Sequence, residues 1–292
     1  MNNQAELFDL IREREKTASK GHRKIAEYIL DHYDKAEYLT AAKLGECVGV
    51  SESTVVRFAS DLGFSGYPEF QRSLREAARN KLTAVQRIEQ SRLSSEDVFS
   101  KVLKNDIDHI RQTLEETDEQ NFNAAVDSII GAKHIYILGV RSSAALASFM
   151  GYYFQLMRPD VVTLRQGSRS ELFEQLMRLG EGDLLIGISF PRYSRQTVQA
   201  LAYARKKGAG TLTITDSLDS PIAENSGNVL LARSDMVSFV DSLVAPMSVI
   251  NALIAAVALK NHDEVEKSFA TLEEIWDEYD VYQKNEDGNH NV

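Results

Sequence analysis

Two short segments combine hydroxyl and guanidinium side chains directly after runs that predict buried β-strands. The first, Gly-Val-Arg-Ser-Ser-Ala at 139–144, follows the apolar run 134–138; the second, Ser-Phe-Pro-Arg-Tyr-Ser-Arg-Gln-Thr at 189–197, follows 184–188. Helical periodicity begins within or just after each segment. Hydroxyls and backbone N–H groups at a helix N-terminus bind anions. The pair of segments therefore favours an anion site, while the alternative for each segment alone is ordinary helix capping.

The elements that must position these segments alternate between strand and helix from about residue 122. Strands are predicted at 134–138, 161–164, 184–188, 211–215 and 229–231, with helices at 144–157, 170–179, 197–207 and 222–225 between them. This alternation predicts a doubly wound parallel sheet between helical layers. Ligands of such sheets bind at the carboxyl ends of the strands, where both segments lie. Two further helices are predicted at about 242–260 and 263–282.

A different pattern occupies 41–60, Ala-Ala-Lys-Leu-Gly-Glu-Cys-Val-Gly-Val-Ser-Glu-Ser-Thr-Val-Val-Arg-Phe-Ala-Ser. Its apolar spacing predicts two short helices that meet at a sharp turn at Gly49, as in a helix-turn-helix. On the second helix Arg57 could pair with guanine, and Val56 could contact a thymine methyl group. An ordinary helix pair with solvated hydroxyls is the alternative. The positions of the second helix expected to be exposed are Glu52, Ser53, Thr54, Val56, Arg57 and Ser60. The residues predicted to contact DNA are Lys43, Ser51, Ser53, Thr54, Val56, Arg57 and Ser60.

Composition limits the function classes. The chain of 292 residues carries a formal net charge of −10, which argues against broad electrostatic binding to nucleic acid. Acidic and basic residues nearly balance in 1–80, so any DNA affinity of that region is expected to need two copies. The single cysteine, Cys47, fits a reducing compartment. The apolar run 243–259 contains Pro246 and Asn251, and it predicts a buried helix rather than a membrane span. We therefore expect a cytoplasmic protein with no membrane partner.

The chain resembles the RpiR family of bacterial transcriptional regulators over nearly its whole length. The N-terminal resemblance rests on SESTVVRFASDLGFSGYPEF, and the C-terminal resemblance to a sugar isomerase (SIS) domain rests on HIYILGVRSS, GDLLIGISF and ARKKGAGTLTITDSLDSPIA. The resemblance implies a homodimer or homotetramer whose affinity for a double-stranded DNA operator is changed by a sugar phosphate or other anionic sugar. The expected domains are an all-α helix-turn-helix domain at 1–80, a linker and connecting helix at 81–121, an α/β three-layer SIS-like domain at 122–285, and a disordered tail at 286–292.

The same resemblance suggests which residues hold the effector. Ser143 matches the serine after the first strand, while Ser189 and Ser194 match the first serine and the threonine of the family's Ser-x-Ser-Gly-x-Thr loop. The chain departs from the pattern at Arg141, where a glycine is expected, and at Pro191-Arg192, where Ser-Gly is expected. One hypothesis is an effector with a carboxylate or more than one anionic group; the alternative is that the arginines pair with nearby acids and narrow the pocket. The predicted effector-binding residues are Arg141, Ser142, Ser143, Ser189, Arg192, Ser194 and Thr197.

A sugar-phosphate isomerase built on the same sheet is the competing function. Isomerisation needs a general acid and base beside the sugar carbons, yet no histidine falls in either strand-end segment. Glu171, Glu174 and Asp216 could approach the pocket, although lone carboxylates there are more often structural. No Cys/His cluster suggests a metal, and no cofactor is expected. We therefore predict a binding domain without turnover. The two terminal helices also have enough apolar surface for a protein-interaction module, expected here as self-association.

Overall fold

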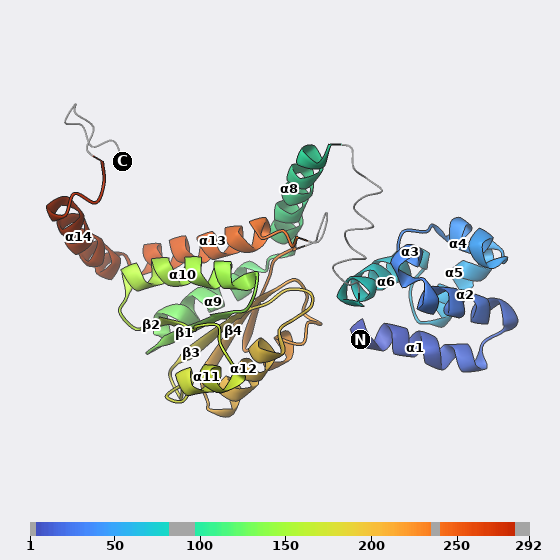
Figure 1. Ribbon diagram of the computed structural model, residues 1–292, viewed down its shortest axis with the longest axis horizontal. Coiled ribbons are helices and arrows are strands. Elements are labelled where there is room, and N and C mark those ends of the chain that lie inside the picture. Colours follow the sequence, from blue (N-terminus) through green and yellow to red (C-terminus); the bar gives the residue numbers. More distant parts are fainter. Residues whose placement is uncertain (1–3, 82–96, 235–239, 284–292) are drawn as a thin grey trace. The chain divides into compact units, whose positions relative to one another are not determined.

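The computed structural model describes residues 4–81, 97–234 and 240–283 of the chain. It separates into two compact units, one of residues 1–101 with 236–240 and the other of 102–235 with 241–292 (Figure 1). Most of the predicted linker, residues 82–96, and the predicted disordered tail, 286–292, lie outside the described residues. No single helix in the described ranges is long and apolar enough to cross a membrane; α13 (Val244–Lys260) and α14 (His262–Glu278) pass that test only as a pair bent by 101°.

The N-terminal unit is built entirely of helices among its described residues. Their buried side chains form one core, with Ile25, Leu44, Phe58 and Phe70 among those fully or almost fully enclosed. The Tyr67 hydroxyl donates to the Leu39 carbonyl at 2.6 Å, and burial raises the pKa of Tyr67 to about 12. The helices are α1 (Gln4–Thr17), α2 (Lys20–Asp31), α3 (Tyr33–Ala36), α4 (Ala41–Val48), α5 (Glu52–Asp61) and α6 (Tyr67–Lys81).

The C-terminal unit is a three-layer α/β domain, as predicted. Its five parallel strands lie in the order β2-β1-β3-β4-β5. The strands are β1 (Ile135–Gly139), β2 (Val161–Thr163), β3 (Leu184–Ile188), β4 (Gly210–Thr215) and β5 (Asn228–Leu231). The helical elements are α8 (Val98–Glu116), α9 (Glu119–Gly131), α10 (Ser143–Met157), α11 (Arg169–Gln175), α12 (Arg195–Lys206), η1 (Ala223–Asn225), α13 (Val244–Lys260) and α14 (His262–Glu278).

Alternation along the strands sends side chains to two separate cores. Ile135 and Ile137 of β1 pack with α9, α10 and α13 on one face, whereas Tyr136 and Leu138 pack with α11 and α12 on the other (Figure 1). All residues of β1 and β3 are buried, because helices cover both faces of the sheet. Such strands are continuous apolar runs in the sequence.

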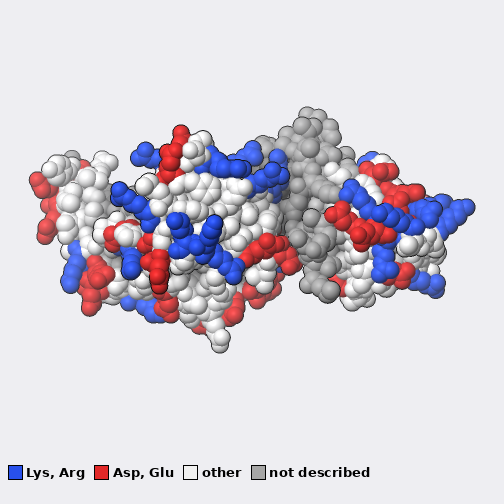
Figure 2. All heavy atoms as spheres, turned by 90° about the horizontal axis from the view of Figure 1, so that it is seen from below, with Lys and Arg blue, Asp and Glu red and all other residues white. Residues whose placement is uncertain are grey.

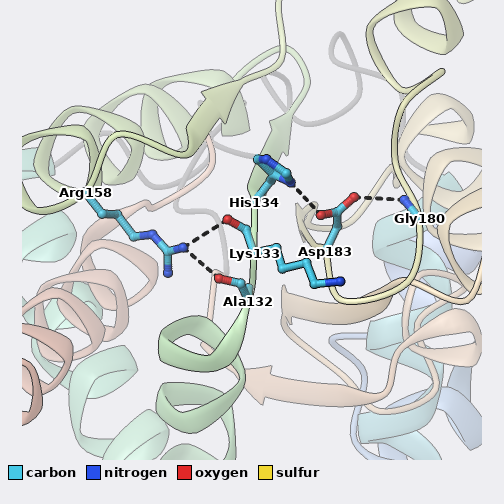
Figure 3. A network of polar contacts seen from close by, with 6 residues as sticks. All are labelled: Ala132, Lys133, His134, Arg158, Gly180 and Asp183. Carbon is cyan, nitrogen blue, oxygen red and sulfur yellow. Dashed lines mark hydrogen bonds and ion pairs between the residues drawn. The ribbon is translucent and has the colours of Figure 1, made fainter.

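Polar contacts tie the amino ends of β1 and β3 together (Figure 3). His134 Nδ1 lies 2.8 Å from an Asp183 carboxylate oxygen, and the other carboxylate oxygen of Asp183 accepts the Gly180 N–H at 2.9 Å. The Arg158 guanidinium donates to the Ala132 and Lys133 carbonyls just after α9. His134 therefore holds the sheet at the edge opposite the two polar loops.

Candidate functional site

Two glycines shape the turn between α4 and α5. Thr40 caps α4, and Gly49 ends it in the left-handed conformation with φ +71°. The Val50 N–H donates to the Gly45 carbonyl at 2.9 Å. A Cβ atom on Gly45 would lie only 2.8 Å from the Val50 carbonyl oxygen, so the chain cannot close this turn around a larger residue without shifting. The predicted two-helix motif is thus present, with a tight turn.

The outer face of α5 presents the side chains that sequence reasoning selected for contact with DNA. Ser51 caps the helix, and its hydroxyl lies 2.9 Å from the Ser53 hydroxyl and 2.8 Å from that of Thr54. Ser53, Arg57 and Ser60 are exposed, and Val56 is 38% exposed beside them. A helix with this mixture of hydroxyl, methyl and guanidinium groups can read base edges in a major groove.

Thr54 is less exposed than the sequence predicts. It is half-buried, because its methyl group faces Gly21 of α2. Its hydroxyl is already within hydrogen-bonding distance of Ser51. Thr54 therefore links α5 to α2 and the N-cap.

Lys43 and Arg75 supply positive charge near this motif. Lys43 Nζ lies 2.8 Å from a Glu46 carboxylate oxygen, and that hydrogen bond raises the pKa of Lys43. The Arg75 guanidinium lies over the Tyr38 ring, 5.9 Å from its centre. Acidic and basic side chains are mixed on the face of each unit drawn in Figure 2. Charge on that face does not form one continuous basic surface.

The second site is the carboxyl edge of the sheet at β1 and β3. These strands are adjacent, with Gly139 opposite Ile188 in register. The chain leaves β1 toward β2 on one side and leaves β3 toward β4 on the other. Doubly wound α/β sheets bind their ligands at such a reversal of strand order. All seven predicted effector residues lie in the loops or first helical turns that follow these two strands.

The loop after β1 is held by partners from distant segments. Arg141 has φ +59°, its backbone N–H donates to Gln166 Oε1 at 3.2 Å, and the Ser142 hydroxyl donates to an Asp241 carboxylate oxygen at 3.3 Å. Ser143 begins α10 and is 5% exposed. The loop therefore presents the Arg141 side chain, which is exposed, from a fixed backbone.

In the loop after β3, serine hydroxyls accept hydrogen bonds from backbone N–H groups that follow them in the chain. The Ser189 hydroxyl accepts the Ser194 N–H at 3.1 Å, and the Ser194 hydroxyl caps α12 by accepting the Thr197 N–H. Arg192 has φ +66° and an exposed side chain. The Thr197 side chain is fully buried, and its hydroxyl has no hydrogen-bond partner in the described part of the chain. Because a buried hydroxyl normally has a hydrogen-bond partner, the Thr197 hydroxyl is suited to donate a hydrogen bond to an anionic ligand.

The carboxylates near this edge already have partners. Glu171 forms a capping box with Ser168 at the start of α11, and Glu174 accepts the Ser170 hydroxyl at 2.9 Å. Asp216 accepts the Tyr193 hydroxyl at 2.8 Å. Each therefore has an evident structural role. Within residues 4–81, 97–234 and 240–283, no group of three or more His, Cys, Asp or Glu side chains is placed to hold a metal ion.

One feature that sequence reasoning missed is the connection of this edge to α8. Next to Asp241, the Ser242 hydroxyl donates to an Asp106 carboxylate oxygen at 2.6 Å. Farther along α8, Arg233 pairs with Glu116, and the Arg233 N–H donates to the Thr113 hydroxyl at 2.9 Å. No local sequence signal joins residues so far apart in the chain. The segments on either side of 235–239 thus connect the Ser142 loop to the helix that follows the linker.

Comparison with known proteins matches both units. The model of the helix-turn-helix domain, rpiR family, matches residues 5–81, and the SIS domain model matches residues 128–256. The HTH-type transcriptional regulator HexR of Pseudomonas aeruginosa is 27% identical over 261 residues, covering 87% of this chain and 90% of the relative.

Solved structures agree with this assignment. The sugar isomerase domain of an RpiR transcription factor from Sphaerobacter thermophilus is 34% identical with a TM-score of 0.59, covering 61% of this chain and 99% of that one. The Vibrio vulnificus NanR protein complexed with ManNAc-6P shares the fold, with a TM-score of 0.59 and 20% identity over 95% of this chain and 100% of that one. The chain belongs to the RpiR family of transcriptional regulators, with an N-terminal helix-turn-helix domain and a C-terminal SIS domain.

Proposed function

We propose that this regulator controls carbohydrate metabolism in the cytoplasm, and that an anionic sugar bound at the carboxyl edge of β1 and β3 changes its affinity for an operator. The observation that carries the proposal is the unpartnered, fully buried Thr197 hydroxyl in the first turn of α12. The Thr197 N–H donates to the Ser194 hydroxyl at the N-terminus of this helix, and the Ser194 N–H donates to the Ser189 hydroxyl. A phosphate group would satisfy that hydroxyl and the positive end of the helix together.

On the DNA side, α5 would enter the major groove. Arg57 is assigned to a guanine edge, Val56 to a thymine methyl, and Ser53 and Ser60 to base edges or phosphates. Ser51 and Thr54 hold one another at the N-terminus of α5, so their role is to position this helix and to reach backbone phosphates. Lys43 is assigned to a phosphate on the neighbouring backbone.

Binding by one copy alone would be weak, because the N-terminal region has no excess of basic residues. α8 offers a surface for pairing: Leu103, Ile107, Ile110 and Leu114 follow one another at spacings of four, three and four, and all are at least 40% exposed. That spacing forms an apolar stripe along one helix face. A second copy covering the stripe would give a dimer, and two α5 helices would then match a two-fold operator.

Effector binding would reach the N-terminal unit through α8. The Ser142 hydroxyl donates to Asp241, which lies in the segment just before α13. The hydroxyl of the next residue, Ser242, donates to Asp106 of α8. A ligand that forms a hydrogen bond with the Ser142 hydroxyl would change the contact between Ser142 and Asp241. The neighbouring contact between Ser242 and Asp106 of α8 would change with it. Such a ligand changes operator affinity only to the extent that it binds one conformation of the regulator, either the one that binds DNA well or the one that binds it poorly, more tightly than the other.

Several contacts support binding without turnover. Glu171 and Glu174 are occupied at the start of α11, and Asp216 is occupied by Tyr193. An isomerase would need one of these carboxylates to reach a sugar carbon as a general base. Incubating the full chain with glucose 6-phosphate and with N-acetylmannosamine 6-phosphate tests this: formation of an isomer that Glu171→Gln abolishes would favour the enzyme.

The main test uses DNA selected by the full-length protein from a random library. We expect Arg57→Ala to weaken binding to the selected sequence about tenfold or more, because a bidentate guanine contact contributes about 1–3 kcal/mol. Arg12→Ala, which removes an exposed arginine of α1 that pairs with Asp9, is the matched control. Equal loss in both variants, or no selected sequence at all, would contradict the assignment of α5.

A further inference from the structure

Two arginines occupy backbone conformations that normally favour glycine, and both lie at the same edge of the sheet. Arg141 follows β1 with φ +59°, and Arg192 follows β3 with φ +66°. Left-handed backbone is unfavourable for a residue with a side chain, by about 1–2 kcal/mol. The surrounding structure must hold such residues in place, and they concentrate at functional sites.

The partners that hold each backbone do not involve the guanidinium group. Arg141 is fixed through its N–H by Gln166 and through its carbonyl, which accepts the Ala144 N–H at 3.1 Å. Arg192 lies between Phe190, which is 5% exposed, and Tyr193, whose hydroxyl donates to Asp216. None of these contacts involves a guanidinium group, so the backbone shape of the two loops does not require arginine at either position.

Neither guanidinium group has an ion pair or a hydrogen bond with any residue in the described ranges. The acids at this edge are engaged elsewhere, Asp216 by Tyr193 and Asp241 by Ser142. The alternative in which the arginines pair with nearby acids and narrow the pocket thus has no support among these residues. Two exposed cations remain at this edge, one in the loop after each of two adjacent strands.

We propose that Arg141 and Arg192 bind a second anionic group of the effector, so that the effector is a doubly anionic sugar, most favourably a phosphorylated sugar acid. This inference rests on the proposed function, in which the start of α12 takes the phosphate. A planar carboxylate accepts two parallel hydrogen bonds from a guanidinium fork. A second phosphate has the same charge and also accepts from the fork, so the shared chemistry is a second anion opposite the α12 phosphate site.

The test compares matched pairs of compounds on the full-length protein by calorimetry and thermal unfolding. The pairs are 6-phosphogluconate with glucose 6-phosphate, 3-phosphoglycerate with glycerol 3-phosphate, and fructose 1,6-bisphosphate with fructose 6-phosphate. We expect at least one doubly anionic member to bind about tenfold or more tightly than its partner, the effect of a charge-assisted hydrogen-bond pair. An advantage in the first two pairs identifies a carboxylate, and an advantage confined to the third identifies a second phosphate.

Variants connect that advantage to the two arginines. Arg141→Gly and Arg192→Gly should each reduce the ratio of affinities within the pair, and the double variant should bring it close to one. Arg12→Ala should leave the ratio unchanged. Glycine suits the left-handed backbone, so these variants are expected to fold, and their thermal unfolding without ligand verifies this.

The outcomes separate this inference from the function beneath it. If every compound binds no better than its singly charged partner, or if the advantage persists in the double variant, the second-anion assignment is wrong. If singly charged sugar phosphates bind and change operator affinity in that case, the proposed function stands without it. If no compound of any pair binds, both fail.

Discussion

The turn of the helix-turn-helix and the two loops at the sheet edge share a backbone conformation but not a residue type. Gly49 has φ +71°, while Arg141 and Arg192 have φ +59° and +66°. In the turn, glycine adopts this conformation without steric strain. At the sheet edge, a cationic side chain is kept in spite of the strain.

This difference separates a position chosen for shape from positions chosen for charge. Between α4 and α5 the only requirement is a tight reversal that brings the Ser51 cap next to Gly45. At the carboxyl edge the loops are already fixed by Gln166, Phe190 and Tyr193. Arg141 and Arg192 adopt a strained backbone that glycine would adopt without strain, which indicates that their side chains are needed.

The largest expected effect tests the close approaches that shape both regions. A Cβ on Gly139 would lie 2.2 Å from the Ser143 carbonyl oxygen, and one on Gly45 would lie 2.8 Å from that of Val50. Gly139→Ala should therefore destabilise the SIS domain by about 3 kcal/mol, and Gly45→Ala the N-terminal domain by somewhat less. Urea unfolding, followed separately for each domain, measures this. Wild-type stability of either variant would mean that the loop can relax around the clash.

The next effect comes from exchanging glycine and arginine between the helix-turn-helix turn and the sheet edge. Gly49→Arg should lower the stability of the N-terminal domain by about 1–2 kcal/mol, because it places a side chain on left-handed backbone. Arg192→Gly should leave the ligand-free SIS domain equally stable or more stable, because relief of strain opposes the greater freedom of glycine in the unfolded chain. Thermal unfolding checks both signs. A large loss of stability in Arg192→Gly would show that the arginine side chain supports the loop.

A third prediction concerns the connection from the sheet edge to α8. Asp241→Asn together with Ser242→Ala removes the carboxylate at Ser142 and the hydroxyl at Asp106. We expect the effect of the effector on operator affinity to fall by about 0.5–2 kcal/mol, while binding of the effector itself changes less. Operator titrations at zero and saturating effector give this coupling. An unchanged coupling would place the connection elsewhere.

The smallest expected effect is a pH dependence at the turn between α5 and α6. The Ser65 hydroxyl and N–H both donate to Glu69 at 2.6 Å, and these bonds lower the pKa of Glu69. A lowered pKa contributes stability above the ordinary glutamate range, and this stability is lost as the pH falls through the folded-state pKa. Glu69→Gln should therefore unfold at a slightly lower temperature than wild type at neutral pH. The gap should close in acid, and a gap that widens there would contradict the assignment.

Much of the sheet could be predicted because its strands are buried on both sides. The apolar runs at 184–188 and 134–138 correspond to β3 and, within one residue, to β1. The caps at Thr40 and Ser51 were also predictable, because capping depends on residues only three positions apart. Exposure of Thr54 was predicted incorrectly, since its environment depends on the approach of Gly21 from another helix.

The remaining part of the site depends on contacts that local patterns do not encode. Ser142 meets Asp241 and Arg141 meets Gln166 only after the sheet has assembled. The left-handed conformation of Arg141 and Arg192 contradicts the preference of arginine. One sequence signal did indicate this conformation: the RpiR resemblance implies glycine at positions 141 and 192.

The central claim is that anionic charge bound beside Arg141 and Arg192 changes how α5 holds DNA. The most direct measurement is the operator dissociation constant of the wild type and of the Arg141→Gly/Arg192→Gly double variant, each titrated with 6-phosphogluconate. We predict a change of about fivefold or more for the wild type. The double variant should match the wild type without ligand and should need about tenfold more 6-phosphogluconate for the same change, because the start of α12 still binds the phosphate. The same concentration dependence in both proteins, or no response in either, would contradict the claim.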